Sequence, residues 1–86
     1  MITVKRFTAL WCSPCRTLAP ALTELASEMA NVQFETIDTG EQEELAAQLG
    51  IRSIPCVVIY RDGTEVDRIV GVHPKSTYKT VITNWL

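Results

Sequence analysis

The stretch from Trp11 to Arg16, Trp-Cys-Ser-Pro-Cys-Arg, places two cysteines three positions apart at the boundary between two residue patterns. Before it, Ile2 to Ala9 alternates and is rich in β-branched and aromatic residues, which predicts a strand. After it, apolar residues recur at intervals of three and four from Pro14 to Met29, which predicts an amphipathic helix. Ser13 suits the N-cap of this helix, and proline suits its first turn. The cysteine pair therefore lies where a strand passes into a helix.

The rest of the chain continues the same alternation of short elements. We predict strands at Val32–Asp38, Val57–Tyr60 and Thr64–Val70, and helices at Glu41–Leu49 and Pro74–Leu86. Asp62-Gly63, between the last two strands, is typical of a two-residue hairpin turn. The order βαβ followed by ββα predicts an α/β fold with a four-stranded mixed sheet and three flanking helices, in one domain over residues 1–86.

Composition restricts the possible functions. The chain has 86 residues and a formal net charge of -2, without the basic patch that nucleic-acid binding requires. Its apolar runs are shorter than the roughly 20 residues of a membrane span, and the N-terminus does not resemble a signal peptide. A chain this short leaves room for a surface groove rather than a deep cavity. We expect a cytoplasmic monomer that binds neither nucleic acid nor membranes.

The three cysteines, Cys12, Cys15 and Cys56, are too few for a disulfide-stapled secreted domain and indicate redox chemistry or metal binding. At a helix start, free amides and the helix dipole stabilise a thiolate, which lowers the pKa of Cys12 below the usual value of about 8.5. Cys12 would then attack a substrate disulfide. Cys15, one turn further into the helix and more buried, would resolve the mixed disulfide.

The motif, its placement and several later residues together resemble the thioredoxin family over nearly the whole chain. The residues that carry the resemblance are Trp11-Cys12-Ser13-Pro14-Cys15-Arg16, Ala19-Pro20, Gly50-Ile51-Arg52-Ser53-Ile54-Pro55, Asp62-Gly63 and Gly71. The resemblance implies a minimal thioredoxin fold and a protein-disulfide reductase. It also implies that Pro55 follows a cis peptide bond and faces the cysteine pair. The substrate-binding residues it implies are Trp11, Ser13, Pro14, Ile54, Pro55, Gly71 and Val72.

The resemblance also implies how electrons reach the protein. No bound cofactor or metal is expected, because the cysteine pair itself stores the two electrons. The donor would be an enzyme of the thioredoxin reductase type, drawing on NADPH or ferredoxin, and the acceptors would be protein disulfides.

Four positions depart from the family pattern, and the mildest is Ser13, which stands where thioredoxins usually have glycine. Arg6 stands where thioredoxins have a buried aspartate that helps to deprotonate the resolving cysteine, and Phe34 stands where a lysine usually accompanies it. The base that serves Cys15 is therefore unassigned, with water as a candidate, and we expect Arg6 to reach solvent or a carboxylate. Cys56 follows Pro55 where threonine is common. We favour a buried packing role for it over a third redox thiol.

Two alternatives remain open at this stage. A glutaredoxin-like enzyme that uses glutathione fits the small size, but Ser13-Pro14, Ser53-Ile54 and Gly71-Val72 differ from the residues usual at these positions in glutaredoxins. A metal-binding module would use the three cysteines, with His73 as the one further soft donor. His73 is otherwise expected to be a loop residue.

Overall fold

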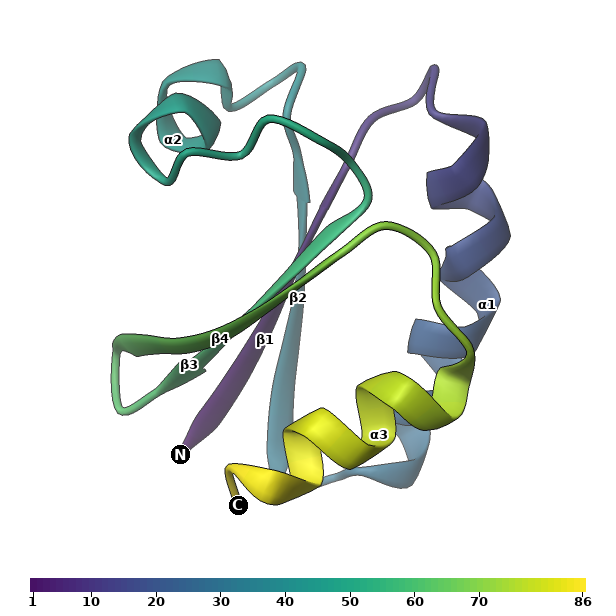
Figure 1. Ribbon diagram of the computed structural model, residues 1–86, viewed down its shortest axis with the longest axis vertical. Helices are drawn as coiled ribbons and strands as arrows, with labels where there is room; N and C mark the ends of the chain where they lie inside the picture. Colours follow the sequence, from purple (N-terminus) through teal and green to yellow (C-terminus); the bar gives the residue numbers. More distant parts are fainter.

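The computed structural model describes all 86 residues and contains four strands and three helices (Figure 1). In chain order they are β1 (Ile2–Thr8), α1 (Ser13–Glu28), β2 (Val32–Asp38), α2 (Glu43–Gln48), β3 (Cys56–Arg61), β4 (Thr64–Val70) and α3 (Lys75–Asn84). The predicted order and the α/β class are confirmed. None of the helices is long and apolar enough to cross a membrane.

Helix α2 is shorter than the sequence pattern predicts. Glu41 and Gln42 stay in a turn, because their amides donate to the carbonyl oxygen of Asp38 at 3.2 and 3.0 Å. The Asp38 carboxylate also accepts from the amides of Gly40 and Glu41. A local side-chain turn of this kind competes with helix formation, so the helix starts two residues later.

The strands form one mixed sheet in the order β2-β1-β3-β4. β1 and β2 are parallel and are joined across α1, whereas β1–β3 and β3–β4 are antiparallel. Asp62 and Gly63, with φ values of 52° and 85°, connect β3 to β4. Two positive φ values in succession are typical of a type I′ hairpin turn, as the Asp-Gly pair predicts.

Helices cover both faces of the sheet, with α1 and α3 on one side and α2 on the other (Figure 1). Side chains alternate between the faces along β1: Val4 joins the larger core of twelve residues, and Phe7 joins a smaller core of four. The helical members of the larger core are Leu18, Leu22, Leu25, Tyr78 and Ile82. α1 is therefore fixed to the sheet along its whole length, which fixes the position of its first residue.

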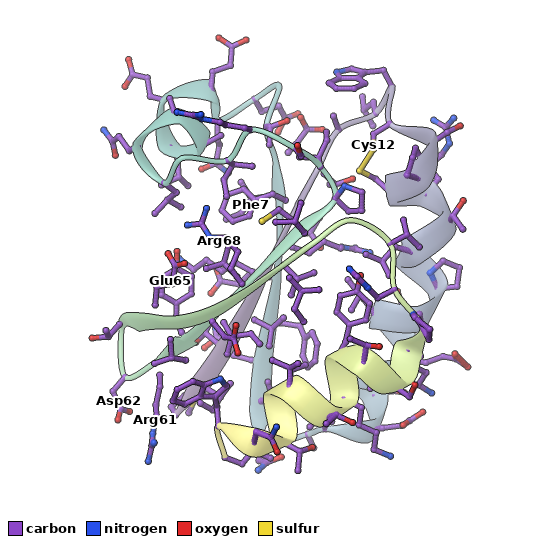
Figure 2. The ribbon with its side chains drawn as sticks, in the orientation of Figure 1. Phe7, Cys12, Arg61, Asp62, Glu65 and Arg68 are labelled. Atoms are coloured by element: carbon purple, nitrogen blue, oxygen red, sulfur yellow. A yellow bond between two sulfur atoms is a disulfide. The ribbon has the colours of Figure 1, made fainter.

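The six-residue α2 covers only part of its face, and charged side chains occupy the neighbouring area. Arg68 donates to both carboxylate oxygens of Glu65 at 2.9 Å and to the carbonyl of Leu49 at 2.8 Å. Figure 2 shows Arg68 and Glu65 close together below α2, with Phe7 above them. The Arg68–Glu65 pair therefore lies on the part of this face that α2 leaves uncovered.

Candidate active site

Cys12, and not Ser13, is the N-cap of α1. Its backbone is extended, with φ −91° and ψ 103°, and its Sγ accepts the amide N–H of Cys15 at 3.2 Å. Ser13 is the first residue of the helix and is exposed. The predicted N-cap at Ser13 is therefore wrong. The atom that accepts the free helix amide is the same sulfur that would react.

Cys12 and Cys15 form a disulfide, with their Cα atoms 5.3 Å apart. The structure is therefore that of the oxidised protein. Figure 2 shows this bond at the N-terminal end of α1. The relative exposure is 4% for Cys12 and 2% for Cys15, so the predicted difference in burial has the right sign but is small.

The loop that leads into β3 lies against the disulfide. Ile54 packs on a small cluster made of Ala9, Cys12 and Cys15. The Ile54–Pro55 peptide bond is cis, and the Pro55 side chain is buried. The structure thus brings this proline loop and the cysteine pair together.

A second loop, Gly71 to His73, lies beside the proline loop. The amide of Gly71, a residue with φ +88°, donates to the carbonyl of Pro55 at 2.9 Å. No backbone hydrogen bond within the protein involves Ile54 or Val72. Each loop therefore has a residue whose N–H and C=O groups remain available to a partner molecule.

Apolar side chains lie next to the cysteines on the outside of the molecule. Trp11 is 76% exposed, and its neighbour Leu10, which was not among the predicted site residues, is 84% exposed. Arg16 holds this segment, donating to the carbonyl of Leu10 at 2.7 Å and to the hydroxyl of Ser13 at 3.3 Å. An apolar residue in the short link between a strand and a helix, directly before an exposed tryptophan, is the signal that could have identified Leu10.

Arg6 does not bind a carboxylate, and its charged end is not fully solvated. One nitrogen, Nη2, donates to the hydroxyl of Thr36 at 2.9 Å, whereas Nη1 is buried without a partner. Burial lowers the pKa of Arg6 below its ordinary value. The residue lines a hollow of about 220 Å³ together with Leu22 and Ala26, which are two and three turns beyond Cys15 in α1. Arg6 therefore supplies no base for Cys15.

Cys56 belongs to the smaller core on the other face of the sheet, with Phe7, Ile37 and Val58. It is 2% exposed, and burial raises the pKa of its thiol. No group of three or more histidine, cysteine or acidic side chains is arranged to hold a metal ion. The position of Cys56 supports its packing role, and its side chain lies on the other face of the sheet from the core that α1 packs against.

The surface hollows lie away from the disulfide. The larger, about 600 Å³, is lined by residues of α2 and the turn before it, including Glu41, Glu43 and Glu44. Neither this hollow nor the one beside Arg6 includes a cysteine. The disulfide thus borders neither hollow, and the two hollows do not form the surface groove expected beside it.

Comparisons with known proteins agree with this geometry. The family model for thioredoxin matches residues 1–84. Thioredoxin 1 of Synechococcus elongatus is 41% identical over 93% of this chain and 76% of its own length, and thioredoxin H-type 1 of Nicotiana tabacum is 37% identical over 94% of this chain and 64% of its own length. The X-ray structure of Fasciola hepatica thioredoxin superposes with a TM-score of 0.91 at 37% identity, covering 96% of this chain and 79% of that one.

These similarities give no support to the glutaredoxin-like alternative. They extend over the sheet, the three helices and the Cys-x-x-Cys segment rather than over one motif. The protein is a thiol–disulfide oxidoreductase, and the Cys12–Cys15 pair is its redox-active disulfide. The chain belongs to the thioredoxin family.

Proposed function

We propose that the protein reduces disulfides of other proteins, with Cys12 as the nucleophile and Cys15 as the resolving thiol. One observation carries the assignment of roles: Cys12 Sγ lies at the N-terminus of the 16-residue helix α1 and accepts the Cys15 amide at 3.2 Å. That amide and the helix dipole stabilise negative charge on Cys12 in the reduced protein. Cys15 lies inside the first turn of α1, and its sulfur accepts no helix amide.

The reaction transfers two electrons in two exchange steps. The Cys12 thiolate attacks one sulfur of the substrate disulfide, a Cys12–substrate bond forms, and the other substrate sulfur leaves as a thiolate that takes up a proton. Cys15 then loses its proton and attacks Cys12 Sγ. The mixed disulfide breaks, the second substrate thiol is released, and the Cys12–Cys15 bond remains. The substrate is reduced and the protein is oxidised.

The proton of Cys15 needs an acceptor other than the side chain at position 6. Arg6 is a cation bound to Thr36, and it lies beside the middle of α1 rather than at its start. Solvent at the open site is the acceptor we propose. The resolving step would therefore depend on solvent base more directly than in relatives with an internal carboxylate.

The two loops beside the disulfide would bind the substrate chain. The unpaired amide groups of Ile54 and Val72 suit an extended segment that adds along the two loops by backbone hydrogen bonds. Pro55 has no N–H to compete for such bonds. Trp11 and Leu10, both largely exposed, would cover apolar side chains on either side of the substrate cysteine.

We further propose that the protein works as a monomer in a reducing cytoplasm and holds no cofactor. The cysteine pair lies beside exposed apolar side chains and borders no enclosed cavity, which suits exchange with large protein partners. The electron donor would be a thioredoxin reductase-type enzyme, linked to NADPH or to ferredoxin.

The test is insulin reduction by the protein, driven first by dithiothreitol and then by each class of reductase, beside a glutathione-coupled assay. We expect insulin reduction with at least one reductase and a Cys12–Cys15 potential near about −270 mV. Activity with glutathione alone, or a potential near the roughly −120 mV of a strong oxidant, would count against the proposal.

A further inference from the structure

The loop Gly71–His73 is held in place by few contacts. Its first residue donates to the carbonyl of Pro55, as described above, and the His73 ring nitrogen Nε2 lies 2.8 Å from the carbonyl of Val70. Gly71 has a positive φ, and the loop residues belong to no helix or strand. The loop therefore depends on side-chain hydrogen bonds for its conformation.

The most buried of these bonds involve the hydroxyl of Tyr78. This side chain is 0% exposed and lies in the first turn of α3. Its hydroxyl donates to the carbonyl of Gly71 at 2.9 Å and accepts the amide N–H of His73 at 3.2 Å. One hydroxyl thus fixes the residues immediately before and immediately after Val72.

We propose that Tyr78 is a positioning residue for substrate binding. By holding Gly71 and His73, its hydroxyl orients the unpaired N–H and C=O of Val72 toward the substrate segment that lies along the loops. This inference rests on the proposed function, and it concerns how the substrate is bound rather than how the sulfurs react.

The ring and the hydroxyl of Tyr78 have separable effects. The ring is part of the larger core, packed between α3 and the sheet, and it stays in place when tyrosine is replaced by phenylalanine. The hydroxyl is lost, and the bonds to Gly71 and His73 are lost with it. A loop without these bonds samples more conformations, so the Val72 groups must be ordered again each time a substrate binds.

The experiment compares Tyr78→Phe with wild type in single-turnover reactions, in which the pre-reduced protein reduces insulin at increasing concentrations. We expect the half-saturating insulin concentration to rise by about three- to tenfold, while the maximum rate is unchanged. The rate with a small aromatic disulfide, which does not reach the loop, and the Cys12–Cys15 potential should also be unchanged. Tyr60→Phe is the matched control, because it removes a phenol oxygen on the other face of the sheet.

Amide hydrogen exchange supplies a second readout from the folded protein. In Tyr78→Phe the His73 amide should exchange at least about tenfold faster, whereas amides of β1 and β3 should not change. An unchanged half-saturating concentration overturns the proposal, and so does an equal loss of rate with insulin and with the small disulfide. If wild type itself fails to reduce insulin, both this inference and the proposed function fall. If wild type reduces insulin and Tyr78→Phe has the same half-saturating insulin concentration, this inference alone falls.

Discussion

The two ends of the sheet are built in opposite ways. At one end, α1 begins and the two loops meet, leaving apolar side chains exposed and the amide groups of Ile54 and Val72 unpaired. At the other end, the two termini lie near the hairpin (Figure 1), and the polar groups are paired. There the N-terminal ammonium contacts the Asp62 carboxylate at 2.8 Å, the Asp62 amide donates to the Met1 carbonyl, and the Trp85 ring donates to Asp67.

This difference assigns binding to the end of the sheet that carries the disulfide and stability to the rest of this small domain. Unpaired donors, acceptors and apolar surface are costly to a folded protein unless a partner completes them. The end that carries the disulfide keeps such groups beside it, whereas the hairpin end pairs its polar groups within the protein. Substitutions at the redox end should therefore change reactivity with little effect on stability, and substitutions far from it should do the reverse.

The largest effect is expected from Cys12→Ser. It removes the nucleophile, so disulfide reduction should fall by at least about a thousandfold, while the reduced variant unfolds in urea within about 1 kcal/mol of reduced wild type. Cys15→Ser is the matched control, because it should still attack and should accumulate as a mixed disulfide with substrate, detectable by mass spectrometry. If instead Cys12→Ser forms the mixed disulfide, the assigned roles are reversed.

A core truncation in α3 should give the opposite pattern. Ile82 is fully buried in the larger core, and Ile82→Ala leaves a cavity there, which should cost about 2–5 kcal/mol of unfolding free energy. Urea denaturation measures the loss, and the exposed Thr83→Ala in the same helix is the control. The Cys12–Cys15 potential of the folded variant should not move. A shift in that potential would show that the two ends are coupled through α3.

Trp11→Ala tests the exposed apolar surface. The side chain is mostly solvated in the free protein, so its removal should change stability by less than about 0.5 kcal/mol. Covering a substrate would bury the ring, and its loss should raise the half-saturating insulin concentration by about tenfold. The small aromatic disulfide should react at the wild-type rate. A loss of stability larger than the loss of binding would place Trp11 in the fold rather than in the site.

Local patterns predicted the fold well. The alternation in β1, the helical spacing in α1 and the Asp-Gly hairpin each depend on neighbouring residues alone, and the topology follows because few arrangements connect βαβ to ββα. The element boundaries shift where a side chain binds nearby backbone. The turn at Asp38 shortens α2. The sulfur of Cys12 caps α1, whereas the sequence predicted that the Ser13 hydroxyl would do so.

Contacts between distant residues could not be predicted in the same way. The partner of Arg6 proved to be a hydroxyl on β2, thirty positions away, and the pattern of β1 carries no information about it. The ring of Tyr78 lies in the larger core, as its place on the apolar side of α3 favours. Its hydroxyl acts on a loop whose path is set by the sheet, so only the folded structure shows the two hydrogen bonds.

The smallest effect is expected from Asp62→Asn at the hairpin end. The N-terminal ammonium lowers the pKa of the Asp62 carboxyl, mainly through their hydrogen bond, but the two groups are 70% and 75% exposed. Asparagine keeps the positive φ and the backbone bond to Met1, so the urea midpoint at pH 7 should fall only slightly.

The pH dependence of that small difference gives the sharper test. Because the folded pKa of Asp62 is depressed, the stabilisation by the pair is complete above the unfolded value of about 3.9 and disappears as the pH falls through the folded pKa. Wild type and Asp62→Asn should therefore differ at pH 7 and coincide in strong acid. Added salt should reduce the difference at pH 7, since the pair is solvated. A difference that persists in strong acid would come from the turn conformation and not from the charge, and the hairpin end would then depend on backbone geometry alone.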